Sequence, residues 1–97
     1  MKELTPYKFY RSEYKLTIEY TKYYNGKLAV ILHDGDDEFG VATVNLPASD
    51  DLDDKTQFVD TNNLPGIDKW LEENDIAEYT GIDGYSGFCA YPLMQFK

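Results

Sequence analysis

The sequence predicts a small α+β fold, in which a three-stranded antiparallel meander and C-terminal strands pack against one α-helix. Residues 14–46 and 88–96 contain strand-like runs, several of which alternate polar and apolar residues, as expected when successive side chains point to opposite faces. Residues 62–74 instead repeat apolar side chains at helical spacing. Because 97 residues supply material for one modest core, residues 1–97 are predicted to form a single domain.

The first two predicted strands form a hairpin. Residues 14–24 alternate in the way of a half-buried strand, and Asn25-Gly26 follows them directly. This pair predicts a type I′ turn, whose two central residues both need a positive φ. The returning strand, residues 27–33, contains an apolar run, so we expect it to be covered on both faces and central in the sheet.

A second turn at residues 34–38 leads to the third predicted strand, residues 39–46. Val41 and Val44 are expected to point from this strand into the core. Residues 47–56 have no periodicity and little apolar content, so they are predicted to form a surface loop.

The predicted helix spans residues 62–74. Asn63 or a neighbouring residue is expected to cap its N-terminus, and Pro65 suits its first turn. An apolar stripe that includes Trp70 and Leu71 should pack against one face of the sheet.

After the helix, residues 76–80 predict a short strand and residues 88–96 a final one. Between them, the glycine-rich residues 81–87 are predicted to form a turn and not a phosphate-binding loop, because no Gly-Lys-Ser/Thr follows. Pro92 cannot donate to a ladder, so the final strand should lie at an edge or be bulged near Pro92.

Charge is uneven along the chain. Residues 1–27 contain six basic and three acidic residues, a net charge of +3, and residues 28–97 contain three lysines and fifteen carboxylates, a net charge of −12. The total of −9 repels nucleic acid and membrane surfaces and attracts basic partners. Direct binding to nucleic acid or to a membrane is therefore not expected.

The carboxylates are grouped in three acidic blocks, and the net charge of −9 exceeds the magnitude of about 2 to 8 that solubility requires. Alternate carboxylates on an extended segment lie about 6.6 Å apart, against about 3.4 Å between phosphates of a DNA strand. The blocks could thus compete with nucleic acid for a partner's basic side chains, and solubility alone remains the alternative. Block 1 is Asp34, Asp36, Asp37 and Glu38; block 2 is Asp50, Asp51, Asp53 and Asp54; block 3 is Glu72, Glu73 and Asp75, with Asp68.

No spacing in the sequence indicates catalysis, so we expect no enzyme, metal or cofactor. His33 and Cys89 are the only residues of their types and have no partners for a triad or metal site. Cys89 is expected to be a small core residue. Block 1 departs from a calcium-binding loop because Phe39 occupies the glycine position, which leaves only a weak surface site for divalent ions open.

Nine tyrosines suggest a second kind of interaction. Most are expected in the sheet and core, and any that are exposed would be anchors for a protein partner. The first quarter of the chain is the richest in aromatic residues, namely Tyr7, Phe9, Tyr10, Tyr14, Tyr20, Tyr23 and Tyr24.

Four runs carry a resemblance to a known group of proteins: Asn45-Leu46-Pro47, residues 58–63, Pro65-Gly66-Ile67 with residues 70–74, and residues 84–93. From Lys15 onward the chain resembles uncharacterised small acidic proteins encoded on conjugative plasmids, integrative elements and phages of Firmicutes. That resemblance implies a mobile-element setting, in which small acidic proteins inhibit host defence as anti-restriction or anti-CRISPR proteins. It implies no catalytic residues. The expected partner is a basic nucleic-acid-binding protein of host defence, met in the cytoplasm.

Overall fold

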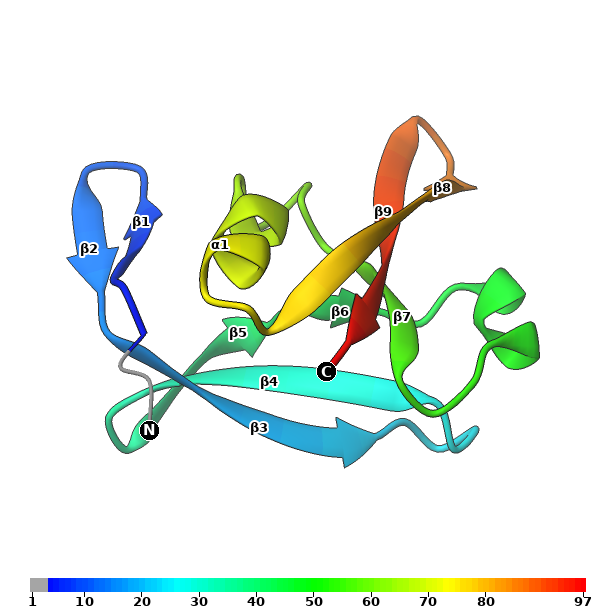
Figure 1. The fold of residues 1–97 in the computed structure, drawn as a ribbon, viewed down its shortest axis with the longest axis horizontal. Helices are drawn as coiled ribbons and strands as arrows, with labels where there is room; N and C mark the ends of the chain where they lie inside the picture. Colours follow the sequence, from blue (N-terminus) through cyan, green and yellow to red (C-terminus); the bar gives the residue numbers. More distant parts are fainter. Residues whose placement is uncertain (1–3) are drawn as a thin grey trace.

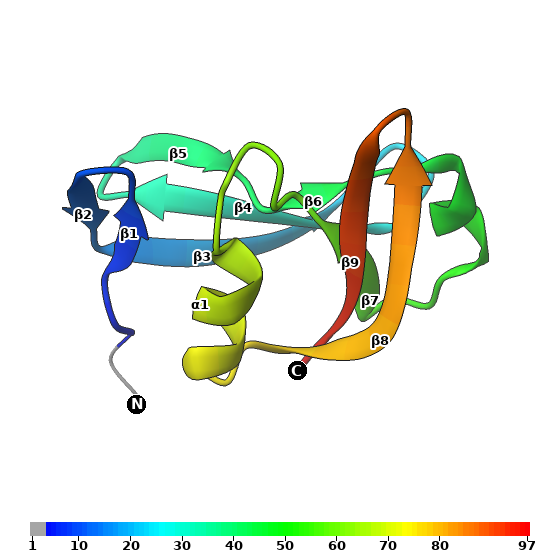
Figure 2. The same ribbon diagram turned by 90° about the horizontal axis from the view of Figure 1, so that it is seen from above.

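A computed structural model describes residues 4–97, and Figures 1 and 2 show strands arranged around a short helix. The described residues form three antiparallel sheets and one α-helix, which confirms the α+β class. Lys2 and Glu3, which contribute to the charge of the N-terminal segment, lie outside the described residues.

The predicted meander is confirmed as the sheet β3–β4–β5, in which β3 (Leu16–Lys22), β4 (Leu28–Asp34) and β5 (Asp37–Val41) pair antiparallel. As expected, β4 is the central strand, and its residues are mostly buried. The turn between β4 and β5 contains Gly35 with a φ of +63°.

The hairpin at Asn25-Gly26 is confirmed, but the predicted type I′ turn is wrong. Only Gly26 has a positive φ, at +82°, and the loop closes through Tyr23 N–H donating to Lys27 O at 2.8 Å. Such a three-residue loop needs one left-handed residue, not two. Asn25 is used differently, because its Oδ1 accepts from Lys27 N–H at 3.1 Å.

The predicted strand at residues 39–46 changes sheet at Ala42. Ala42 N–H donates to Val30 O and Ala42 O accepts from Asp60 N–H, both at 2.8 Å, so this residue joins the two larger sheets. The following β6 (Thr43–Val44) pairs with β7, not with β4. This break reverses the expected alternation: Val41 is exposed, and Val44 is only partly buried, in a minor cluster. The prediction that both valines point into the core is wrong for Val41.

The second sheet has the order β6–β7–β9–β8, with β7 (Thr56–Val59), β8 (Ala77–Ser86) and β9 (Cys89–Phe96). The sequence did not predict β7. The predicted turn at residues 81–87 is also wrong, because β8 continues through it and the chain reverses at Gly87 and Phe88.

Pro92 lies in β9, which is an inner strand and not an edge. A bulge does lie near Pro92, but on the partner strand, because the extra residues are those of β8 between Tyr79 and Asp83; the prediction is right in position and wrong in strand. Pro92 pairs with Asp83 just after this bulge and lies one residue beyond the last β7–β9 pair, Phe58 with Leu93. Its missing N–H therefore interrupts no bond to β7.

Two short elements were not predicted. The hairpin β1 (Tyr7–Phe9) and β2 (Ser12–Tyr14) precedes the meander, and the 3-10 helix η1 (Pro47–Asp51) lies inside the segment predicted to be a loop. The side chain of Ser49 anchors η1, because it is fully buried and its hydroxyl donates to Gln57 Oε1 at 2.8 Å.

The helix α1 (Ile67–Glu73) is shorter than predicted. Its N-cap is Gly66, with a φ of +76°, so neither Asn63 as cap nor Pro65 in the first turn is correct. Asn63 instead donates from its backbone N–H and its Nδ2 to the carboxylate of the buried Asp60, at 3.1 and 2.8 Å. That turn redirects the chain before the helix can begin.

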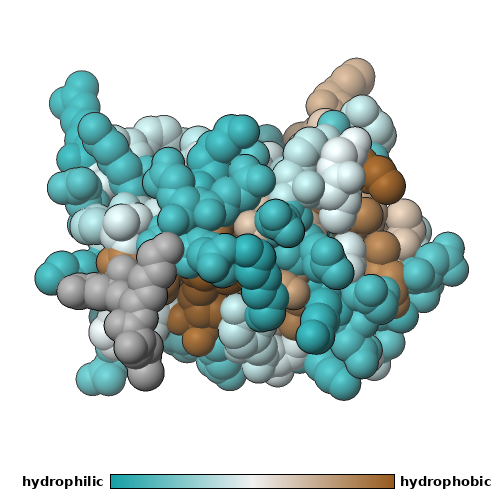
Figure 3. All heavy atoms as spheres, in the orientation of Figure 1, coloured by the Kyte–Doolittle hydropathy of each residue, from teal (hydrophilic) through white to brown (hydrophobic). Residues whose placement is uncertain are grey.

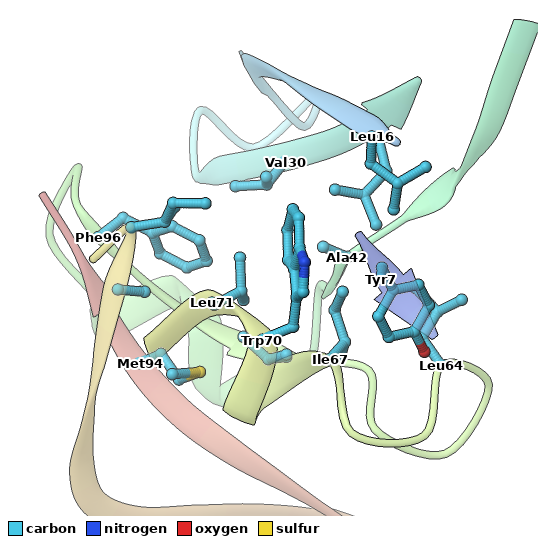
Figure 4. Close-up of a cluster of buried hydrophobic side chains, with 14 of the residues drawn as sticks. Tyr7, Leu16, Val30, Ala42, Leu64, Ile67, Trp70, Leu71, Met94 and Phe96 are labelled. Atoms are coloured by element: carbon cyan, nitrogen blue, oxygen red, sulfur yellow. The ribbon is translucent and has the colours of Figure 1, made fainter. Parts of the chain in front are cut away.

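The main core lies where α1 meets the two larger sheets and the N-terminal hairpin (Figure 4). The predicted stripe is confirmed, because Trp70 is 4% exposed and Leu71 is fully buried. Cys89 was expected in the core, but it is only partly buried at the start of β9, near the hairpin turn. Figure 4 shows Trp70 in the middle of this core, with Met94 and Phe96 on one side and Tyr7 on the other.

Tyr7 makes the stability of the fold sensitive to alkaline pH. Its hydroxyl donates to Pro65 O at 2.8 Å, and burial, with smaller effects of Tyr10 and Asp68, raises its pKa from 10.0 to about 12. The raised pKa stabilises the folded state fully below about pH 10, and this stabilisation is lost as the pH rises toward 12. We expect the free energy of unfolding to fall across this window.

Urea unfolding at pH 8, 10 and 11.5 would measure this dependence. The variant Tyr7→Phe should show a weaker dependence, and the matched Tyr24→Phe, at a fully exposed site, should behave as the wild type. A residual slope is expected because burial also raises the pKa of Tyr23. Equal slopes in wild type and Tyr7→Phe would contradict the prediction.

Candidate functional site

The three acidic blocks lie in different parts of the molecule. Block 1 occupies the β4–β5 turn, block 2 occupies η1 and the loop after it, and block 3 lies on α1 and, with Asp75, just after it. Figures 1 and 2 both place the β4–β5 turn and η1 at opposite ends of the longest axis, which measures 33 Å. The blocks are therefore three separate acidic surfaces and not one continuous face.

The carboxylates of the blocks are available to a partner. All are exposed except Asp68, which is partly buried. Two ion pairs are present among the described residues, Glu19 with His33 at 2.7 Å and Asp75 of block 3 with Lys97. A lysine or arginine of a partner would thus meet block carboxylates that, apart from Asp75, form no ion pair within the described chain.

Two aspartates of block 2 also form hydrogen bonds within the fold. Asp53 Oδ1 accepts from Thr56 Oγ1 at 2.7 Å and from Lys55 N–H at 2.9 Å, and these hydrogen bonds lower the pKa of Asp53. Asp50 Oδ1 accepts from Asn25 Nδ2 at 3.1 Å. Within residues 4–97, neither Asp51 nor Asp54 makes a hydrogen bond of this kind, and both are exposed, so only part of block 2 is free of a role in the fold.

Block 3 borders a groove between α1 and the β8–β9 hairpin, with a volume of about 350 Å³. Asp68 and Glu72 line it from the helix, and Tyr79 and Asp83 line it from β8. Tyr79 Oη donates to Asp83 Oδ1 at 2.8 Å, and this bond raises the pKa of Tyr79. Lys69, Thr61, Ala90 and Pro92 complete the lining.

The groove exists because α1 is too short to cover the whole inner face of β9. Met94 and Phe96 lie under the helix and are 0% and 3% exposed. Pro92 and Ala90 follow on the same face at intervals of two residues, and there burial falls until Ala90 is exposed. The outer half of the hairpin therefore presents a sheet face that none of the described elements covers.

The same hairpin has large apolar side chains in solvent. Tyr79 is 44% exposed, Ile82 59%, Tyr85 73% and Phe88 110%. Figure 3 shows apolar surface gathered where this hairpin projects, at the upper right, while most of the visible face is hydrophilic. The groove and these side chains together form the aromatic hairpin site, defined as Asp68, Glu72, Tyr79, Ile82, Asp83, Tyr85 and Phe88.

Sequence reasoning found Asp68 and Glu72 of this site but missed Asp83 and the aromatic residues. It expected most aromatic residues of the first quarter of the chain in the sheet and core, and Tyr7, Phe9 and Tyr14 do pack in or against the core. Tyr10, Tyr20 and Tyr24 are exposed there, as the prediction allowed. The available signal was Phe88 itself, since a large apolar residue next to a glycine-rich segment is placed for exposure.

A comparison with protein families identifies the chain's relatives. The family described as "Domain of unknown function (DUF4313)" matches residues 16–97, most of the chain. The chain belongs to this family. No curated protein and no solved structure matches it. The matched part of this DUF4313 chain begins at the first residue of β3 and includes all three acidic blocks and the aromatic hairpin site.

Metal sites, membrane-spanning helices and the single histidine were the other features to consider in the described part of this DUF4313 chain. No group of three or more His, Cys, Asp or Glu side chains there is arranged to hold a metal ion. None of its described helices is long and apolar enough to cross a membrane. His33 contacts Glu19 through Nε2 on the outer side of the sheet β3–β4–β5.

Proposed function

We propose that this protein is a non-enzymatic inhibitor encoded by a mobile genetic element, of the anti-restriction or anti-CRISPR type. Its partner is a basic nucleic-acid-handling protein of host defence, with which its carboxylates compete against nucleic acid. The observation that supports this function is the set of exposed carboxylates that form no ion pair within the described chain. The resemblance to small acidic proteins of plasmids, integrative elements and phages supports the setting.

The separation of the acidic blocks limits how such an inhibitor works. With block 1 and block 2 at opposite ends of a 33 Å axis, one flat basic channel meets one block and its surroundings at a time. Exposed ion pairs contribute about 0 to 1 kcal/mol each, so the charges mainly accelerate association and select basic partners. Affinity must come from additional apolar contact next to a block.

Competition with nucleic acid is the direct test. The protein, immobilised through a terminal tag, is exposed to lysate of a bacterial host at 50 and 300 mM salt, and the captured proteins are then challenged with duplex DNA or RNA. We expect a basic protein that is retained at low salt, weakened at high salt and displaced by nucleic acid. Neutralising a contacting block, for example with Asp36→Asn and Asp37→Asn, should reduce retention about tenfold.

The matched control carries the same change in charge outside the blocks, as Glu13→Gln with Glu19→Gln. If retention of the partner does not change with salt, with added nucleic acid or with any block variant, the competition mechanism is ruled out. Equal losses in block and control variants would show that net charge alone matters.

A second candidate function is an interaction module that regulates transfer or replication of its mobile element. The exposed aromatic side chains of the β8–β9 hairpin and the free outer edge of β8 favour it, because edge strands offer unpaired backbone groups to a partner. Tyr85→Ala would then weaken partner binding more than the neutralisation of any acidic block.

A further inference from the structure

The β8–β9 hairpin exposes four large apolar side chains, Tyr79, Ile82, Tyr85 and Phe88. Tyr85 and Phe88 are 73% and 110% exposed, and Ile82 lies between them and Tyr79 along the chain at 59%. Apolar patches that are bordered by polar residues typically mark interaction sites. Here the border is acidic, since Asp83 lies on the same strand and Asp68 and Glu72 lie across the groove.

The hairpin is fixed in this orientation by its packing. Gly84 lies directly on the ring of Phe58, where a Cβ would come within 2.4 Å of Phe58 Cε1. Because side chains alternate along a strand, Asp83 and Tyr85 on either side of Gly84 point to the opposite, groove-facing side. The acidic and aromatic groups of the groove are thus presented by a packed sheet and not by a loose loop.

We propose that the aromatic hairpin site binds an extended, arginine-bearing segment of a protein partner. Guanidinium groups would lie against Asp68, Glu72 or Asp83 and stack on the ring of Tyr85, and apolar parts of the segment would cover Phe88. This proposal rests on the proposed function, for which it names the contact site and the chemistry of the partner.

Charge complementarity selects this occupant. The groove carries three carboxylates and one lysine, so a cationic segment is attracted to it. A second copy of the chain brings another net charge of −9 and is repelled. Arginine fits better than lysine because its planar group makes paired hydrogen bonds to carboxylates and also stacks on aromatic rings.

The test uses the full chain and two synthetic probes, a nine-residue peptide that alternates arginine with serine and its lysine counterpart. Backbone NMR shifts of the labelled protein map the site, and fluorescence anisotropy of the labelled peptide gives the affinity at 50 mM salt. We expect shifts concentrated on Asp68, Glu72 and residues 79–90, and binding of the arginine peptide about threefold tighter than that of the lysine peptide.

Matched variants separate this site from general acidity. Tyr85→Ala should lower the affinity for the arginine peptide about fivefold. Tyr24→Ala, the same change at a fully exposed tyrosine, should leave the affinity unchanged. Asp68→Asn with Glu72→Gln should lower the affinity more than Asp51→Asn with Asp54→Asn. Asp68 is partly buried and the other five positions are exposed, and circular dichroism confirms that each variant is folded.

Several outcomes would overturn the proposal: shifts spread evenly over the three acidic blocks, equal effects of the tyrosine variants, or equal affinity for both peptides. Self-association through residues 79–90, detected by sedimentation, would assign the site to a second copy instead. If lysate capture depends on block 1 or 2 but not on this site, the proposed function stands without this inference. If the peptide binds here but nucleic acid displaces none of the captured proteins, this inference stands and the proposed function fails.

Discussion

Replacing Trp70 with alanine is expected to lower the free energy of unfolding by about 3 to 5 kcal/mol. Trp70 is 4% exposed and its ring meets the Tyr7 ring edge-on, with centroids 6.1 Å apart. Its Nε1 also donates to Thr5 O at 2.7 Å, which ties the N-terminal segment to α1. Alanine would leave a cavity in the middle of the core and remove this bond. Because small domains have a total free energy of unfolding of about 5 to 15 kcal/mol, this substitution would remove a large fraction of the stability.

Trp70→Phe is the matched variant, because it fills most of the volume and loses only the N–H donor. Its expected loss is about 1 to 2 kcal/mol, close to the value of one buried hydrogen bond and a small packing defect. Urea unfolding should be followed by far-UV circular dichroism, since Trp70 is the only tryptophan and both variants lose its fluorescence. A loss below 1 kcal/mol in Trp70→Ala would contradict the central position of this side chain in the core.

The parts of the fold that depend on neighbouring residues could be predicted from the sequence. The β3–β4 hairpin follows from two strand-like runs around Asn25-Gly26, and the buried face of α1 follows from the spacing of Ile67, Trp70 and Leu71. The turn type could not be predicted, because one left-handed residue, Gly26, closes the loop together with a side-chain bond of Asn25.

The predictions that were wrong concern segments whose structure depends on contacts with residues far away in the sequence. Ala42 bonds both Val30 and Asp60, so a run that reads as one strand is divided between two sheets. In β8, Gly81 adopts a φ of +90° inside a bulge and does not end the strand. Glycine marks both turns and bulges, and the sequence does not distinguish them.

The candidate site was predictable only in its charges. Each carboxylate of block 3 is visible in the sequence, but the groove depends on where α1 ends relative to β9. Aromatic residues such as Tyr85 are accessible because no element in the described part of the chain covers the outer half of the hairpin. These are properties of packing between elements, which local patterns do not contain.

Gln57→Leu is expected to lower the free energy of unfolding by about 3 to 5 kcal/mol, because it leaves several buried polar groups without partners. Gln57 is fully buried in β7, where its Oε1 accepts from Ser49 Oγ at 2.8 Å and from Phe58 N–H at 2.9 Å. Its Nε2 donates to Leu28 O at 3.1 Å. One amide thus connects η1, β7 and β4, and an apolar side chain of similar size would replace none of these bonds.

Gln57→Glu tests whether the hydrogen bonds or the volume matter, because it keeps the shape and the oxygen that accepts two hydrogen bonds but loses the donor to Leu28 O. Burial disfavours the charged form, so the pKa of the introduced carboxyl should be raised above its value in the unfolded chain. By linkage, this variant should be least destabilised near pH 4, where the neutral carboxyl can again donate, and most destabilised near pH 7. Urea unfolding of both variants and the wild type at these two pH values would measure the difference. If Gln57→Glu and Gln57→Leu lose the same stability at both pH values, the side chain acts by filling space, and the hydrogen-bond network is not what fixes η1 and block 2 to the sheet.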